Sequence, residues 1–248
     1  MKIKKFINRF KKLVSILIKP GNAYIYLRPK YESHVISFGQ EGEDLILKKI
    51  QKIQKLNRIG FYVDVGAYHP TKYSNTYLFY LMDYKGINID PNPGAMKAFD
   101  ELRPNDINLE IGVSSKENKL KYYMFKEGAY NTFSEERAKI ISQYNEILDT
   151  VEIATYTLEK IFDEYLPPNQ VIDLLDIDVE GLDLDVLKSN NWVKYKPRII
   201  MIEDLKRSTV EEVLENEITQ FLKSNDYDFL LKTINTLFYI HKDSELEF

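Results

Sequence analysis

Short apolar segments alternate with polar, helix-like segments along most of this chain. Five of the apolar segments are rich in β-branched and aromatic residues, which favour strands: residues 61–65, 86–90, 107–113, 171–178 and 198–202. Between them, apolar residues recur at the three- and four-residue spacing of amphipathic helices. Because parallel strands are joined by helices that cover the sheet, this alternation predicts an α/β fold with helices on both faces.

The remaining helices and strands follow from the same patterns. Helices are predicted within residues 37–56, from about residue 74, and at 92–102, 134–145, 182–187 and 208–223. Further strands are predicted at 120–125 and 151–154, and a closing hairpin at 227–231 and 237–241. Asn92 has the residue type of a helix N-cap, and Ser208 and Glu211 have the spacing of a capping box. Residues 31–248 are therefore predicted to form one domain.

A glycine turn ends the first predicted strand. Gly66 permits backbone angles that other residues resist, and it lets a ligand approach the backbone. The next helix begins near residues 74–76, so its free N–H groups would point back at this turn. Asp90 ends the following strand about 20 residues later, the interval at which an acid reaches ribose hydroxyls in nucleotide-binding sheets. This spacing predicts a ribose-containing ligand at the carboxyl ends of the strands.

The glycine turn lacks the pattern of a dinucleotide site. Gly66 is followed by Ala67 and Tyr68 rather than by a second close glycine, which disfavours a pyrophosphate at the backbone. S-adenosylmethionine (SAM) has a ribose but no phosphate, so it fits this turn better. The alternative is that Asp64 and Asp90 only cap helices, but the pair at this spacing favours the cofactor.

The ordered set of motifs resembles the FkbM-type SAM-dependent methyltransferases. The matching segments are QEGED at residues 40–44, VDVGA at 63–67, SNTY at 74–77, GINIDPNP at 86–93 and DIDVEG at 176–181. The resemblance extends from about residue 37 to residue 242. It implies a Rossmann-like class I methyltransferase fold, with a mostly parallel seven-stranded sheet and a C-terminal antiparallel hairpin.

The resemblance and the spacing together indicate which residues contact SAM. They are Gln40, Asp44, Asp64, Gly66, Ala67, Asn75, Asp90, Pro91, Ser114 and Asp178. The turn at residues 40–44 is implied to cover the SAM pocket, although acids in a first helical turn also complement the helix dipole. Ser114 is included by analogy with the fold alone, because the third strand flanks the adenine in SAM enzymes.

Methyl transfer to a hydroxyl needs a base and an aligned, dry pocket. His69, Asp178 and Glu180 are the predicted catalytic residues, and Glu203 is a further acid at a neighbouring strand end. A histidine titrates near neutral pH, yet a lone histidine is more often a structural hydrogen-bonding residue. Close carboxylates also bind Mg²⁺ through oxygen, or simply cap helices. A site without metal is favoured over one with Mg²⁺, and SAM is the predicted cofactor.

Composition and charge restrict the partners. The chain has no cysteine, which excludes disulfides and thiolate metal sites and suits a reducing cytoplasm. The net charge is −4, and the first 20 residues contribute +7, so the rest of the chain carries −11. Such an acidic body argues against a nucleic-acid partner, which needs clustered Lys and Arg.

Residues 1–30 are predicted to be a basic arm and linker outside the domain. Apolar residues within 1–20 follow helical spacing among seven Lys and Arg, which predicts an amphipathic helix rather than a transmembrane span or signal peptide. The helix either lies on an anionic membrane surface or docks on the acidic body or a second subunit; a disordered arm is the third alternative. The expected location is therefore the cytoplasm, either free or peripheral at the inner face of the membrane, with a homo-oligomer as an open alternative. Sedimentation with anionic vesicles distinguishes these alternatives. Membrane binding should be seen at low salt and be released by added salt, whereas a docking element leaves the protein in the supernatant.

The nature of the acceptor follows from the resemblance rather than from particular residues. It implies O-methylation of sugars or natural products. Together with the basic arm, this favours a sugar in a cell-surface glycan or its lipid-linked precursor, as in bacterial polysaccharide biosynthesis. The alternatives are a non-catalytic SAM-binding scaffold in glycan assembly, and a methyltransferase that acts on a protein or a small natural product.

Overall fold

The computed structural model describes residues 35–53 and 58–244. The chain divides into two compact units, residues 1–37 and 38–248, and the fold below is that of the second. The predicted basic helix and linker lie outside the described residues, so their binding partner stays a prediction. Within the described part of the chain, no helix is long and apolar enough to cross a membrane.

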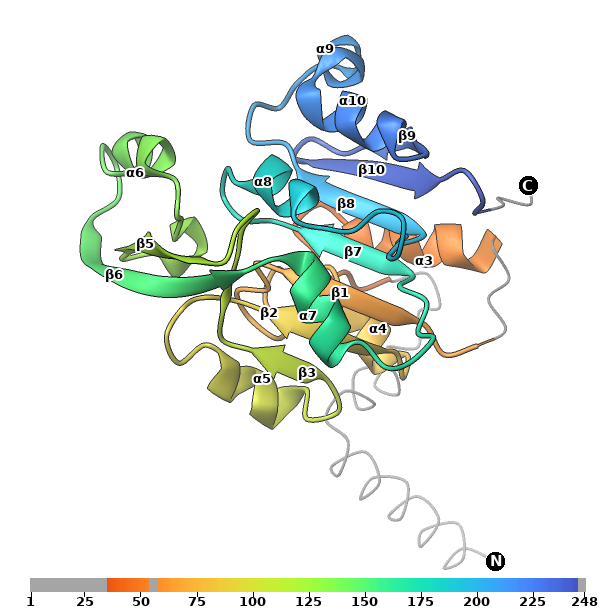
Figure 1. Ribbon diagram of the computed structural model, residues 1–248, viewed down its shortest axis with the longest axis horizontal. Helices are drawn as coiled ribbons and strands as arrows, with labels where there is room; N and C mark the ends of the chain where they lie inside the picture. Colours follow the sequence, from red (N-terminus) through yellow and green to blue (C-terminus); the bar gives the residue numbers. More distant parts are fainter. Residues whose placement is uncertain (1–34, 54–57, 245–248) are drawn as a thin grey trace, which may run out of the picture. The chain divides into compact units, whose positions relative to one another are not determined.

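A sheet of seven strands forms the centre of the second unit (Figure 1). Its order is β3-β2-β1-β7-β8-β10-β9. The strands are β1 (Phe61–Val65), β2 (Lys85–Ile89), β3 (Ile107–Leu109), β7 (Leu174–Ile177), β8 (Ile199–Glu203), β9 (Tyr227–Lys232) and β10 (Thr236–His241). Neighbours pair in parallel except β10, which is antiparallel to both β8 and β9. The predicted Rossmann-like sheet and its C-terminal hairpin are confirmed.

Helices cover both faces of this sheet. Side chains alternate between the faces along a strand, and in β1 Val63 packs in one core cluster and Tyr62 in the other. The Val63 cluster includes residues of α7 (Leu158–Tyr165), α8 (Asp183–Lys188), α9 (Val210–Glu215) and α10 (Glu217–Ser224). The Tyr62 cluster includes residues of α3 (Glu43–Ile53) and α4 (Tyr77–Leu81). Burial on both faces explains why the central strands are continuous apolar segments in the sequence.

The third apolar segment forms two strands, so the prediction of one continuous strand at 107–113 is wrong. β3 ends at Leu109, whose carbonyl accepts the N–H of Asp90, and the chain then leaves the main sheet. β4 (Gly112–Val113) instead pairs with β6 in a second sheet of order β4-β6-β5. Gly112 fits there because it lacks a side chain: a Cβ would lie 2.7 Å from the Phe133 ring.

The second sheet consists mainly of a long antiparallel ribbon, β5 (Asn118–Phe125) with β6 (Ile147–Tyr156). This ribbon projects away from the main sheet (Figure 1). Both strands are longer than predicted. The first half of β6 is mostly exposed and lacks the alternation of apolar and polar residues that marks a half-buried strand. Between the strands lie η1 (Gly128–Tyr130) and α6 (Glu135–Ile141), which Ser134 caps and which is shorter than the predicted 134–145.

The predicted start of the helix after β2 is wrong. The helix is α5 (Met96–Leu102), and the residue at its N-cap position is Ala95 rather than Asn92. The Asn92 carbonyl instead accepts the N–H of Ala95 in a turn, and Gly94 adopts a positive φ of 84° there. The turn separates the end of β2 from α5, so the polar residues that suggested a cap form a loop beside the strand end.

The helix predicted at 208–223 is two helices, and its capping box is displaced. The box is formed by Thr209 and Glu212, one residue later than predicted. Ser208 cannot serve as the cap, because its hydroxyl donates to an acid of the preceding loop. Asn216 ends α9 and its side chain caps α10. A polar residue with cap chemistry therefore divides what looked like one amphipathic helix.

Arg103 is fully buried and fastens the segment before α4 to β2. Its guanidinium donates to the Pro70 carbonyl at 2.8 and 2.5 Å, and to Asn88 Oδ1 at 3.1 Å. It also donates to the hydroxyls of Ser74 and Thr76, at 2.6 and 2.8 Å. A buried charge persists only when its donors are hydrogen-bonded, and such a network holds its members in one geometry. Arg103 thereby orders the chain that follows the glycine turn.

Candidate functional site

The carboxyl ends of β1, β2, β7 and β8 open into a cavity of about 490 Å³. Residues that follow β1 and β2 line one part of it: Gly66, Tyr68, Asp90 and Pro91. Residues at the ends of β7 and β8 line another part: Asp178, Glu180 and Glu203. The ribbon and η1 add a wall of Tyr122 and residues 127–133. A cavity of this size at this edge of an α/β sheet is typical of a small-molecule site.

Gly66 brings the ends of β1 and β7 into direct contact. Its backbone has a positive φ of 88°, and a Cβ at this position would lie 1.7 Å from the carbonyl oxygen of Asp178. The N–H groups of Gly66 and Ala67 both donate to the Ile89 carbonyl, at 2.9 and 3.1 Å. Glycine is therefore required here for both the backbone angles and the space.

Asp90 lies at the end of β2 with its carboxylate at the cavity. One oxygen accepts the N–H of Tyr68 at 2.8 Å and the other accepts the N–H of Asn92 at 2.8 Å. The residue is 6% exposed. Burial raises the pKa of Asp90 to about 6, and the two backbone hydrogen bonds limit this rise. Each oxygen retains a lone pair for a ligand hydroxyl.

The raised pKa of Asp90 predicts a pH-dependent affinity. Lowering the pH from 7 to 5 crosses the pKa of about 6 and protonates the carboxylate. A neutral carboxyl group is a weaker acceptor, so we expect calorimetry to show weaker binding of S-adenosylhomocysteine at pH 5 than at pH 7. Asp90→Ala should weaken binding at pH 7 by about 1–3 kcal/mol, the value of a hydrogen bond to a charged group, and abolish the pH dependence.

The matched control for Asp90→Ala is Glu101→Gln, which removes an exposed acid of α5 that does not line the cavity. This control should bind as the wild type does at both pH values. Wild-type affinity in a folded Asp90→Ala protein would contradict the assignment of this carboxylate to the ribose.

Two other predicted cofactor residues lie behind the cavity wall. Asp64 is 5% exposed, and its carboxylate accepts the hydroxyl of Thr76 at 2.5 Å. Ala67 is buried in a small cluster with Met96 and Phe99. Neither residue lines the cavity. Asp64 and Ala67 shape the turn around Gly66, and their direct contact with a cofactor stays a prediction.

Asp44 and Ser114 also have structural partners and do not line the cavity. The Asp44 carboxylate accepts the N–H of Phe38 at 2.8 Å and that of Leu45 at 2.9 Å, which complements the start of α3. The Ser114 hydroxyl donates to Asp185 at 2.8 Å, and so ties the end of β4 to α8. The lining near the adenine position predicted for Ser114 comes instead from Ile111 and Val113.

Gln40 and Asn75 line the cavity, and their contact with a cofactor stays a prediction. The Asn75 amide donates to Asp176 at 3.0 Å, which connects the segment before α4 to β7. Glu43 lines the cavity beside Gln40, and its carboxylate accepts the hydroxyl of Thr236 at 3.2 Å. The turn before α3 is therefore part of the cavity wall.

Three acids meet at the ends of β7 and β8. Oxygens of Asp178, Glu180 and Glu203 lie within 4.8 Å of one another. Arg137 of α6 donates twice to Glu180 Oε2, at 3.1 Å from both Nε and Nη2, while Glu203 Oε2 is buried without a hydrogen-bond partner among the described residues. Asp178 follows directly after β7, which is shorter than the strand predicted at 171–178. The cluster has the oxygen ligands that a divalent cation prefers, but Arg137 already binds one of the three carboxylates.

Burial and mutual repulsion make these acids hold protons. Burial raises the pKa of Glu203 far above the usual range, and the neighbouring Asp178 raises it further. Burial also raises the pKa of Asp178, and Glu180 adds to that effect. Two close buried carboxylates do not ionise independently, and the hydrogen bond between them lowers the pKa of Asp178 and raises that of Glu203. Such a pair contains both a proton acceptor and a proton donor.

His69 is placed differently from the acids. Its Nδ1 accepts the N–H groups of Thr71 and Lys72, at 3.1 and 3.0 Å, and it does not line the cavity. Burial lowers the pKa of His69, and the positive charges of Lys72 and Arg103 lower it further. The imidazole is therefore neutral and orders the turn after the glycine. Its role as the base stays a prediction, with less geometric support than that of Asp178.

Sequence reasoning missed part of the lining. Residues 131–133 are expected from the sequence to help form the wall of the acceptor site, whereas Tyr122 is not. The rings of Tyr122 and Phe133 lie 4.7 Å apart, centroid to centroid, and both residues line the cavity. Tyr73, Leu205 and Arg207 line it as well. Tyr73 and Arg207 both have a positive φ, of 56° and 52°. None of these residues lies in a recognisable motif, because their position depends on loops that only the folded chain brings together.

The charges of the lining indicate the kind of ligand. The acids are Glu43, Asp90, Glu127, Asp176, Asp178, Glu180 and Glu203, whereas the cations are Lys72, Arg137 and Arg207. SAM carries a sulfonium and an ammonium against a single carboxylate, so this excess of acids complements it. A dinucleotide would bring a pyrophosphate into an acidic cavity. The residues present therefore fit SAM and oppose a nicotinamide or flavin dinucleotide.

A comparison with protein families gives an independent result. A comparison with curated proteins returns no match. The family model of the methyltransferase FkbM domain matches residues 64–229, which includes Gly66, Asp90 and the three acids. That range covers the strands of the main sheet except the first three residues of β1, the last three of β9 and strand β10. With the sheet order and the cavity at its carboxyl edge, this match shows that the chain belongs to the FkbM methyltransferase family.

Proposed function

We propose that this methyltransferase uses SAM to methylate a hydroxyl group of a sugar, in a cell-surface glycan or its lipid-linked precursor. The observation that carries the proposal is the division of one cavity into two parts. Asp90 and Gly66 form the part suited to a nucleoside, and Asp178 and Glu203 form the part suited to a group that loses a proton. The two parts meet where Gly66 contacts Asp178.

The chain itself has to align the acceptor and remove a proton. Bound SAM supplies a methyl group on a sulfonium, and the sulfur keeps the electron pair when the S–C bond breaks. Asp178 accepts the proton of the acceptor hydroxyl, while the oxygen of that hydroxyl forms the new O–C bond to the methyl group. The raised pKa suits Asp178 to this task near neutral pH.

The neighbours of Asp178 control its environment. Arg137 neutralises Glu180, so that negative charge does not accumulate beside the base. Glu203 keeps its own proton and donates a hydrogen bond to Asp178, which orients that carboxylate. The buried cluster excludes water from the reacting oxygen, which favours transfer to the acceptor over transfer to water.

The wall opposite the strands supports a sugar as the acceptor. Tyr122 and Phe133 offer ring faces, while Asn131 and Thr132 offer polar groups in the same segment. Sugars present C–H faces and hydroxyl groups together, so they complement aromatic rings interspersed with polar side chains. A long peptide or nucleic acid would need an extended groove rather than this enclosed corner.

The test compares surface glycan from cells with and without the gene by mass spectrometry. Loss of a methyl group from one sugar, restored by the wild-type gene but not by a gene encoding Asp178→Asn, supports the proposal. Full restoration by Asp178→Asn would indicate the non-catalytic scaffold. An unchanged glycan, with a methyl group lost from a protein or a small molecule instead, would indicate one of the other acceptor classes.

A further inference from the structure

Arg207 lies on the loop between β8 and α9 in a backbone conformation that L-residues rarely adopt. Its φ is +52°, and the residue lines the cavity. Strained non-glycine residues persist only where the surrounding structure determines them, and they concentrate at ligand sites. The loop begins directly after Glu203, the last residue of β8, so Arg207 lies close in sequence to the acid cluster.

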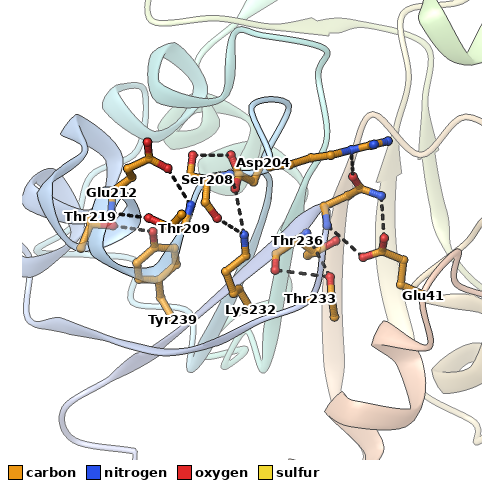
Figure 2. Close-up of polar contacts among 12 residues, drawn as sticks. Glu41, Asp204, Ser208, Thr209, Glu212, Thr219, Lys232, Thr233, Thr236 and Tyr239 are labelled. Atoms are coloured by element: carbon orange, nitrogen blue, oxygen red, sulfur yellow. Dashed lines mark hydrogen bonds and ion pairs between the residues drawn. The ribbon is translucent and has the colours of Figure 1, made fainter.

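The surrounding contacts do determine this conformation. The N–H of Arg207 donates to the carbonyl of Asp204 at 3.0 Å. The carboxylate of Asp204 accepts the N–H and the hydroxyl of Ser208, at 2.7 and 3.1 Å, and forms an ion pair with Lys232 of β9 at 3.3 Å. Figure 2 shows Asp204 between Ser208 and Lys232. The loop is thus fastened on both sides of Arg207.

The side chain of Arg207 is held as well. Its Nε donates to Asn235 Oδ1 at 3.0 Å. Asn235 in turn donates to the carboxylate of Glu41, at 2.9 Å from its backbone and 2.6 Å from its amide. Figure 2 draws Glu41 at the far end of this network. The guanidinium is therefore oriented by a chain of contacts from three separate loops.

The terminal nitrogens of Arg207 remain available. Within the part of the chain that the structure describes, neither Nη donates to a protein atom, and no carboxylate forms an ion pair with this guanidinium. The other two cations of the lining differ: Arg137 is paired with Glu180, and Lys72 lies over the Tyr73 ring at 4.6 Å. Arg207 is thus an oriented guanidinium whose forked end has no protein partner.

The position of Arg207 relates it to the reacting hydroxyl. Its partner Asn235 precedes Thr236, which pairs with Glu203 across β10 and β8. In the sheet order, β10 follows β7 and β8, which carry the acid cluster, on the side away from β2 and Asp90. Through Asn235, Arg207 is therefore placed beyond the acid cluster as counted from Asp90. A group bound there belongs to the acceptor rather than to the nucleoside.

We propose that Arg207 binds an oxyanion of the acceptor, so that the methylated sugar is an acidic one carrying a carboxylate or a phosphate. The guanidinium fork matches both groups in a bidentate geometry. This inference rests on the proposed function and narrows its substrate class. The acids around the cavity repel anions elsewhere in it, so an anionic group is accepted only where Arg207 can bind it. Arg207 therefore selects the acceptor by charge as well as by shape.

The test uses the full-length protein saturated with S-adenosylhomocysteine, whose binding is first measured by calorimetry. NMR titrations then give dissociation constants for three probes: the methyl glycoside of glucuronic acid, glucose 1-phosphate and the neutral methyl glucoside. We expect one charged probe to bind at least about tenfold more tightly than the neutral probe. Whichever charged probe is preferred identifies the oxyanion as carboxylate or phosphate.

Variants then assign this preference to Arg207. Arg207→Met should reduce the ratio of the affinities for the charged and neutral probes to about one, without changing the affinity for S-adenosylhomocysteine. Lys206→Met removes an equal charge from an adjacent exposed residue that does not line the cavity, and should keep the preference. Equal binding of all three probes, no binding of any probe, or a preference that survives Arg207→Met would overturn the inference alone. Failure of the wild type to bind S-adenosylhomocysteine would overturn the proposed function with it.

Discussion

Replacing Asp178 by asparagine is expected to lower the rate of methyl transfer by about 100-fold or more, and to leave the affinity for S-adenosylhomocysteine within a few-fold. Asparagine keeps the shape of the side chain but cannot accept the proton of the acceptor hydroxyl. An interaction made mainly in the transition state changes the rate with little effect on ground-state binding. The rate is measured as labelled methyl incorporated from SAM into glycan isolated from cells that lack the gene.

Three companion variants define what Asp178 does. Glu203→Gln should shift the pH dependence of the rate, because the hydrogen bond from Glu203 lowers the pKa of Asp178. Glu180→Gln should lower the rate as well, since it leaves Arg137 unpaired beside the base. Glu164→Gln, an exposed change on α7, serves as the control and should be silent. If Asp178→Asn and Glu180→Gln turn over at the normal rate, the base lies elsewhere and His69 is the next residue to replace.

The pH dependence of the methyl-transfer rate tests the proposed role of Asp178 as the base independently. Burial raises the pKa of Asp178, so its proton is released at a higher pH than an ordinary carboxyl group would require. The rate should therefore rise with pH over a range well above pH 4. Chelation separates this mechanism from a metal-dependent one: activity that survives EDTA excludes an essential divalent cation, whereas recovery only with Mg²⁺ would make the three acids its ligands.

Gly66→Ala should abolish the binding of S-adenosylhomocysteine and lower the free energy of unfolding by on the order of 3 kcal/mol or more. The added Cβ would lie 1.7 Å from the Asp178 carbonyl oxygen, so the ends of β1 and β7 would have to separate. That separation disrupts both parts of the cavity. Urea unfolding measures the stability, and calorimetry measures the affinity.

Gly94→Ala is the matched control for Gly66→Ala. Gly94 has a similar positive φ of 84°, but a Cβ there meets nothing within 4 Å. This variant should lose only about 1 kcal/mol of stability, from the backbone strain alone, and bind S-adenosylhomocysteine normally. Equal losses in the two variants would show that φ, rather than the contact between the strand ends, makes Gly66 necessary.

The sequence predicted the lining beside β1 and β2 better than the lining contributed by the loops near β8 and β10. Gly66 and Asp90 lie at the ends of consecutive parallel strands, so their spacing along the chain translates directly into proximity. The same reasoning placed Asp178 and Glu180 at the cavity. It did not distinguish Asp64 from Asp90. Asp64 lies within β1 and bonds Thr76 at the N-cap position of α4, whereas Asp90 follows the last residue of β2 and lines the cavity.

The lining near β8 and β10 depends on contacts between distant segments. Arg207 lines the cavity only because Asn235 and Glu41 orient it, and these residues are separated from it along the chain. No local pattern marks an arginine with a positive φ. The division of residues 107–113 between two sheets has the same origin, since the position of Phe133 decides where Gly112 can lie.

The ribbon of β5 and β6 gives the cavity a wall with its own local stability. Most of the first half of β6 is exposed, and β5 is its partner along most of its length. Two-stranded structures are only marginally stable by themselves, so this ribbon should open without the seven-stranded sheet unfolding. Its amides should exchange with solvent hydrogen faster than those of β1 and β7. Ordering the ribbon then contributes an entropic cost to acceptor binding that the nucleoside part of the cavity does not share.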